Sequence, residues 1–244
     1  MINAFLWGAL AASTLLVGAL VALRYSIPKR ALGLIMGFGA GVLLSAVAYD
    51  LVLEASQVAS GQVIVSLGLF SGAVVFFFGT RYFHRLGKTN GDATSQKSSD
   101  SGLAIILGAA LDGIPESIVL GLTLIGGGGV GTTFLLAILL SNLPEGIAGT
   151  TDLLESGWTG AQILRVWTIV VIASAVAALA GYAVFGVASP DIVASVKAFA
   201  GGAIIAMLAD SMIPEAYENG GDFVGFVTTV GFATAFGLTL LEWI

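Results

Sequence analysis

Two six-residue motifs place carboxylates and prolines in the middle of apolar stretches: DGIPES starts at Asp112 and SNLPEG starts at Ser141. On a helix, residues four apart share a face, so Asp112 would lie beside Glu116, and Ser141 beside Glu145. A charged carboxylate at the middle of a bilayer costs ~2.5–3.5 kcal/mol on insertion scales, and acidic residues at that depth normally face a cavity and serve function. These motifs are therefore the first candidates for chemistry in the chain.

Pro115 and Pro144 give the motifs a second property, because proline has no backbone N–H and interrupts the hydrogen-bond ladder of a helix. We predict that these two residues are helix-breaking and that they leave the carbonyls of Leu111 and Leu140 without their usual donors. Besides these carbonyls, the predicted metal ligands are the side chains of Asp112, Glu116, Ser141, Asn142 and Glu145.

The carboxylates of this oxygen cluster carry negative charge that a positive charge must balance. No Lys, Arg or His is expected in the interior of any span to supply it. Balance would then come from protons or from a bound cation, as in a cation pathway. The alternative is that the prolines merely kink two helices while the acids stay protonated and hydrogen-bonded to their neighbours.

The amino-acid composition indicates whether the helices that carry these residues lie in water or in lipid. Of the 244 residues 57% are hydrophobic and 10% are charged, and the mean hydropathy is +1.00. This excludes an ordinary soluble domain and makes the lipid bilayer the expected partner. The absence of cysteine excludes disulfides and thiolate metal sites. The absence of a basic face argues against a nucleic-acid partner.

The expected fold class is all-α, a polytopic membrane protein formed by one transporter domain over residues 1–244. About 20 apolar residues are needed for each crossing, and a polar stretch at 85–101 is predicted to be a flexible cytoplasmic loop. The eight expected spans are residues 2–23, 30–54, 62–82, 102–125, 131–152, 161–185, 192–215 and 222–243.

Basic residues orient these spans. Eight crossings put both termini on one side, and nearly all basic residues fall on the other side, in the loops after spans one, three and five or at the adjoining span ends. They are Arg24, Lys29, Arg30, Arg81, Arg85, Lys88, Lys97 and Arg165, with Lys197 as the exception. By the positive-inside rule, both termini are predicted to be extracytoplasmic in a multi-pass protein of the cell (plasma or inner) membrane.

Internal repeats suggest how the spans are arranged. Residues 38–55 (FGAGVLLSAVAYDLVLEA) match residues 199–216 (FAGGAIIAMLADSMIPEA), and these segments belong to spans two and seven, which cross in opposite directions. The two Pro-Glu motifs form a second repeat on spans four and five. Together they predict inverted repeats in a 3+2+3 arrangement. The small residues Gly33, Gly37, Gly41 and Ser45 predict close helix packing, within the protomer or at the interface of a homodimer.

With Pro-Glu on spans four and five, a Gly-rich second span, a polar loop after the third and Ile-Pro-Glu-Ala ending the seventh, the chain resembles the ZIP (Zrt/Irt-like) divalent metal-ion transporters. The resemblance covers essentially the whole chain. It implies that Glu116 and Glu145 ligate the transported metal, that Asp112, Ser141 and Asn142 fill other motif positions, and that spans one, four, five and six move past the remaining four.

The motif also departs from this family. Asp112 stands where the family has His, Gly113 where it has Asn, Ser117 where it has Gly, and Ser141 where it has His or Gln. The predicted site is all oxygen, which suits Mn²⁺, Fe²⁺ or Mg²⁺, although Zn²⁺ also accepts carboxylates.

Four further acids lie near span ends: Asp50, Glu54, Asp210 and Glu215. They could form an entrance and an exit for cations, or they could be interfacial acids solvated by headgroup water. The sequence thus predicts a transporter that moves divalent metal cations of the Zn, Fe or Mn class toward the cytoplasm. The alternative is a proton-coupled transporter of a non-metal solute. In either case we expect no enzyme activity and no tightly bound cofactor, the metal being the substrate.

Overall fold

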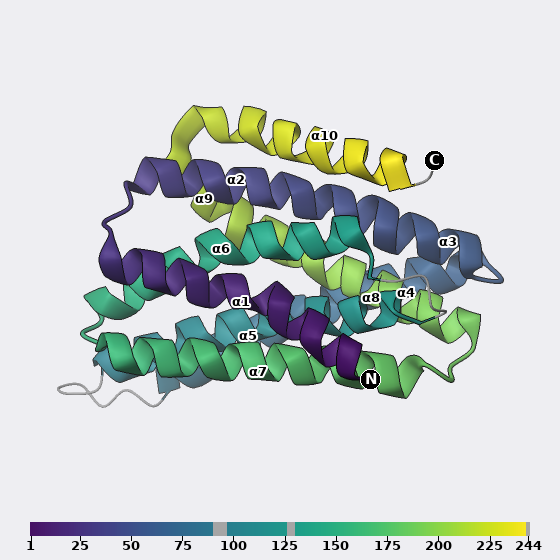
Figure 1. Ribbon diagram of the computed structural model, residues 1–244, viewed down its shortest axis with the longest axis horizontal. Coiled ribbons are helices and arrows are strands. Elements are labelled where there is room, and N and C mark those ends of the chain that lie inside the picture. Colours follow the sequence, from purple (N-terminus) through teal and green to yellow (C-terminus); the bar gives the residue numbers. More distant parts are fainter. Residues whose placement is uncertain (90–96, 126–129, 243–244) are drawn as a thin grey trace.

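The computed structural model describes residues 1–89, 97–125 and 130–242, with the side chains of 83–105, 107, 110–112 and 242 left out. Within these ranges the chain is helical and contains no strand (Figure 1). The long helices are α1 Ile2–Arg24, α2 Lys29–Ala46, α4 Gln62–Thr89, α5 Lys97–Thr123, α6 Thr132–Glu155, α7 Gly160–Phe185, α8 Pro190–Met207 and α10 Val224–Glu242. The shorter elements are η1 Val47–Leu53, α3 Glu54–Val58, η2 Leu208–Met212, α9 Ile213–Gly220 and η3 Gly221–Phe223.

Large apolar side chains cover the outside of the bundle. Leu67 and Phe70 on α4, Ile169 on α7 and Phe226 on α10 are each more than half exposed. A water-soluble monomer does not carry apolar surface on this scale. Six helical runs of the described part are long and apolar enough to cross a membrane. They are Ile2–Arg24, Lys29–Val58, Gln62–Tyr82, Thr132–Glu155, Gly160–Phe185 and Pro190–Leu241. The chain is therefore a multi-pass α-helical membrane protein.

The last of these runs is 52 residues long and is not one straight helix. Gly221 has a φ of 71°, which favours glycine, and the chain reverses there, so that α10 runs back along the bundle (Figure 1). Between α4 and α5 helix covers 85–89 and 97–101, the two ends of the segment predicted to be a loop. The middle of that segment, 90–96, lies outside the described residues.

The helices pack in two groups. α1, α5, α6 and α7 contact one another extensively, and α2 packs on α9 and α10 while α8 packs on α4. The groups meet where α2 crosses α6 and where α8 crosses α5. The main apolar core lies at this meeting, and its buried members include Leu43, Leu120, Ile138 and Ile204.

The two copies of the first repeat carry the same backbone irregularity. In the alignment of 38–55 with 199–216, equivalent residues are 161 positions apart, so Val47 corresponds to Leu208. Val47 begins the π-helical segment η1 and Leu208 begins the π-helical segment η2. The helices that contain them run in opposite directions (Figure 1). π-helical turns are rare and frequent at functional sites, and the repeat alone gave no sign of them.

Equivalent glycines allow both copies to approach their neighbours closely. A Cβ on Gly41 would collide with the carbonyl oxygen of Thr228 on α10, and a Cβ on Gly202 would collide with that of Leu69 on α4. Gly41 and Gly202 are themselves 161 positions apart. The predicted small-residue stripe on α2 therefore packs within the protomer. A homodimer remains a prediction that rests on other surfaces.

Candidate metal centre

A pocket of about 90 Å³ lies where the two helix groups meet. Glu116 reaches it from α5, and Ser141 and Glu145 from α6, while α2, α8, η2 and α9 form the opposite wall. The residues that line it are Met36, Glu116, Ser141, Glu145, Met207, Ser211, Met212 and Glu215. None of the eight is basic, so the described wall carries three carboxyl groups and no positive side chain.

Three of the five predicted metal ligands reach this pocket, namely Glu116, Ser141 and Glu145. Glu116 and Ser141 are each only 3% exposed, whereas Glu145 is half-buried. The Ser141 hydroxyl donates a hydrogen bond to the carbonyl of Ile138 at 3.1 Å, which leaves its lone pairs for another partner. Asp112 lies on α5 one turn before Glu116, but its side chain is outside the described atoms.

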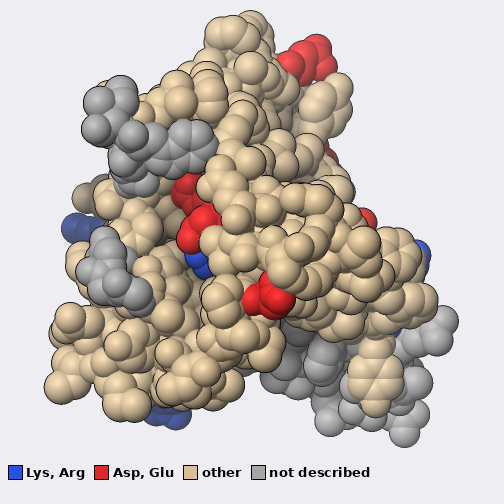
Figure 2. All heavy atoms as spheres, turned by 90° about the vertical axis from the view of Figure 1, so that its right-hand side faces the viewer, with Lys and Arg blue, Asp and Glu red and all other residues tan. Residues whose placement is uncertain are grey.

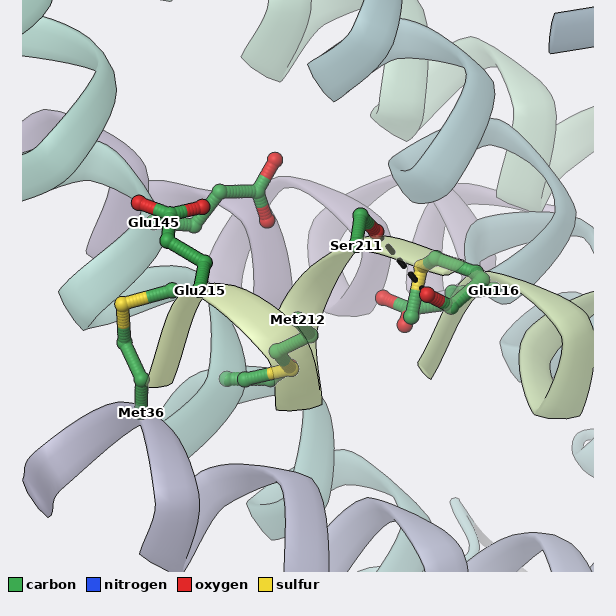
Figure 3. A pocket seen from close by; sticks show the side chains of 8 residues that line it. Met36, Glu116, Glu145, Ser211, Met212 and Glu215 are labelled. Carbon is green, nitrogen blue, oxygen red and sulfur yellow. Dashed lines mark hydrogen bonds between the residues drawn. The ribbon is translucent and has the colours of Figure 1, made fainter. Parts of the chain in front are cut away.

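The carboxylates occupy two ends of the pocket rather than one point (Figure 3). Glu145 and Glu215 lie at one end together with the side chain of Met36, and Glu116 lies at the other end beside Ser211, with Met212 between them. Accordingly, the described His, Asp and Glu side chains include no group of three close enough to hold a metal ion. The chain offers two partial carboxylate sites within one pocket.

The prolines do not end their helices. α5 continues through Pro115 and α6 through Pro144, so each proline removes a hydrogen bond from a helix that continues, and the prediction of broken helices is wrong. The carbonyl of Leu140 faces α2, where a Cβ on Gly39 would be 3.1 Å from its oxygen. At this position α2 and α6 cross closely, because Gly39 has no side chain.

Asn142 points away from the pocket toward α1. Its side-chain amide donates to the carbonyl oxygen of Ala11 at 3.1 Å, and the residue is buried. This hydrogen bond ties α6 to α1. The role of Asn142 as a metal ligand stays a prediction.

The four predicted pathway acids have different surroundings. Glu215 lines the pocket, Asp210 on η2 is exposed, and Asp50 accepts a hydrogen bond from Thr239 at 3.5 Å. Glu54 forms an ion pair with Lys197, whose Nζ lies 2.6 Å from Oε1 of Glu54.

Lys197 corrects one expectation. Its side chain is 7% exposed and it lies within α8, so a basic residue does lie inside a predicted span. Long basic side chains near span ends usually reach the interface, and Lys197 is the sixth residue of the predicted span 192–215. Its ion pair instead holds it among the helices.

Three thioethers were missed by reasoning from the sequence. The chain has four methionines, and all except Met1 line the pocket: Met36, Met207 and Met212. Thioether sulfur is a softer ligand than oxygen and favours later transition metals over Mg²⁺ or Ca²⁺. The only hint in the sequence was that methionine is rare in so apolar a chain, with four residues in all. The pocket is thus not the oxygen-only environment that the motifs predict.

No family model matches the chain, and no curated protein sequence matches it. The fold and the pocket define a class nonetheless: a multi-pass α-helical membrane protein with an acidic and thioether-lined pocket between two helix groups.

Proposed function

We propose that the protein is a membrane transporter that moves divalent metal cations, of the Zn, Fe or Mn class, toward the cytoplasm. The observation that carries the proposal is the pocket, whose described lining includes three carboxyl groups and three thioethers and no basic residue. Acidic side chains inside apolar helices are costly and are retained for ion pathways. A cation with two positive charges is the simplest partner for such a wall.

The size of the pocket favours an ion over an organic solute. A volume of about 90 Å³ holds a cation with a few water molecules, whereas sites for organic ligands usually span about 300–1,000 Å³. This weighs against the second candidate, a proton-coupled transporter of a non-metal solute. What favours that candidate is that Glu116 lies at the other end of the pocket from Glu145 and Glu215 in Figure 3, since carboxyl groups can also carry protons.

The topology that we propose has eight crossings in a 3+2+3 arrangement with inverted repeats. α5 supplies one crossing beyond the six apolar runs, and the turn at Gly221 divides the last run into two. α1 begins and α10 ends on one side of the bundle (Figure 1), the side opposite the basic span ends, which makes it extracytoplasmic by the positive-inside rule. Acidic side chains lie near the middle of this end, with a basic side chain among them (Figure 2), and their excess of negative charge would attract cations.

The pocket lies between the two helix groups, which suits alternating access. A shift of α1, α5, α6 and α7 against the others would expose the carboxylates first to one side and then to the other. This is also the movement that the resemblance to the ZIP transporters implies.

Uptake by proteoliposomes tests the proposal. Vesicles with the purified protein should take up Zn²⁺, Fe²⁺ or Mn²⁺ faster than empty vesicles, and competition among these ions and Mg²⁺ ranks the substrates. Proton movement without metal movement would support the second candidate. If no metal enters under any gradient, the proposal fails.

A further inference from the structure

Lys197 is a buried basic side chain that the pocket does not use. It is 7% exposed and its ammonium meets Glu54 at 2.6 Å. Taking an ammonium out of water is expensive unless a charged partner accompanies it. The place that it occupies therefore favours a positive charge.

The internal repeat relates this place to the pocket. Residues 161 positions apart are equivalent, so Glu54 corresponds to Glu215. Continued two residues back along the same helices, this register makes Met36 the equivalent of Lys197. Glu54 pairs with Lys197, and Glu215 lies beside Met36 in the pocket (Figure 3). The same two positions thus meet in both halves of the molecule, once as Glu with Lys and once as Glu with Met.

The neighbouring helix explains the difference in charge. On α6 a Cβ on Gly146 would collide with the backbone of Leu15 on α1, and on α5 a Cβ on Gly121 would collide with that of Ala178 on α7. These crossings make Gly146 the structural equivalent of Gly121, a register four residues away from the alignment of the two Pro-Glu motifs. In this structural register Glu145 is equivalent not to Glu116 but to the apolar, fully buried Leu120.

The charge balance then differs between the halves. In one half a single carboxylate, Glu54, is neutralised by one ammonium. In the other half two carboxyl groups, Glu145 and Glu215, share a pocket end whose described wall has no basic residue. Two negative charges match one divalent cation where one negative charge matches a lysine.

We propose that Glu145, Glu215 and Met36 form a subsite for a divalent cation. At the position that the internal repeat makes equivalent, the ammonium group of Lys197 takes the place of that cation. The inference rests on the proposed transport function and narrows it, because a thioether beside two carboxylates selects a transition metal such as Zn²⁺ or Fe²⁺ over Mg²⁺.

The test is to place a lysine at position 36, the position in the pocket that is equivalent to Lys197. The Met36→Lys variant should pair with Glu215 and lower the affinity for Zn²⁺ at least tenfold in equilibrium binding to the purified protein. Met36→Leu keeps a similar volume without sulfur or charge, so its preference for Zn²⁺ over Mn²⁺ in equilibrium binding should fall several-fold. Unchanged Zn²⁺ affinity in Met36→Lys, or unchanged preference in Met36→Leu, would overturn the subsite.

A second variant keeps the test decisive if Met36→Lys does not fold. Glu215→Gln preserves shape and removes one of the two charges, and it should lower Zn²⁺ affinity at least tenfold, whereas equal affinity would also overturn the subsite. Failure of the transport proposal has a different outcome, namely wild-type vesicles that take up no metal. Wild-type uptake together with unaltered binding in these variants would refute the subsite alone.

Discussion

The ion pair between Glu54 and Lys197 predicts an asymmetric response to mutation. Glu54→Gln removes the partner and leaves a buried ammonium, whereas Lys197→Met removes the buried charge and leaves a carboxylate that is 47% exposed and can turn to solvent. The first variant should be destabilised, and the second should be as stable as the wild type or more stable.

The magnitude follows from the geometry. Two unit charges 2.6 Å apart attract by roughly 6 kcal/mol at an effective dielectric constant of about 20. The exposure of Glu54 and the desolvation of Lys197 offset most of this, so the expected loss in Glu54→Gln is about 1–3 kcal/mol. For a chain of this size that loss lowers Tm by roughly 2–12 °C.

Thermal unfolding of the purified variants in one detergent gives the measurement, and the double variant closes the cycle. With Lys197→Met in the background, Glu54→Gln should cost almost nothing, because there is no buried ammonium left to strand. The reasoning would be refuted if Glu54→Gln were as stable as the wild type, or if Lys197→Met lost as much stability as Glu54→Gln.

Two further predictions concern packing and the amide on α6. Gly41→Val should prevent folding or lower Tm strongly, because its side chain would collide with the carbonyl of Thr228. The control Gly79→Val on α4 meets open space and should lower the free energy of unfolding by about 1 kcal/mol or less. Equal effects of the two variants on Tm would contradict the close crossing. Asn142→Leu should lower the free energy of unfolding by about 1–2 kcal/mol through loss of the hydrogen bond to Ala11, with Zn²⁺ affinity unchanged in equilibrium binding. A large fall in affinity would instead make Asn142 a ligand.

Local pattern predicted the parts of the site that lie on single helices. The four-residue spacing indicated that Asp112 shares a helix face with Glu116, and that Ser141 shares one with Glu145 on the next helix. Of these residues, Glu116, Ser141 and Glu145 line one pocket. Apolar length predicted membrane-spanning helices, which the structure has. Both inferences need only the geometry of one helix and the thickness of a bilayer.

What escaped prediction depends on contacts between distant segments. Glu215 was expected at a span end, but the crossing of α2 with α9 brings it beside Met36 and opposite Glu145. No basic residue was expected in the interior of a span, yet Lys197 is buried within α8, where Glu54 of α3 pairs with it. Helical periodicity tells which residues share a face, but it does not tell which two faces meet. Those meetings are set by glycine-mediated crossings such as that of Gly39 with Leu140.

The most direct test of the transport function compares two carboxylates on the same helix. Glu145 lines the pocket, whereas Glu155 lies exposed at the end of α6. In proteoliposomes with matched protein content, Glu145→Gln should reduce the initial rate of Zn²⁺ or Mn²⁺ uptake at least tenfold, and Glu155→Gln should leave it near the wild-type rate. Uptake that is equally fast in both variants, or equal to that of empty vesicles in the wild type, would contradict a divalent-cation transporter built on this pocket.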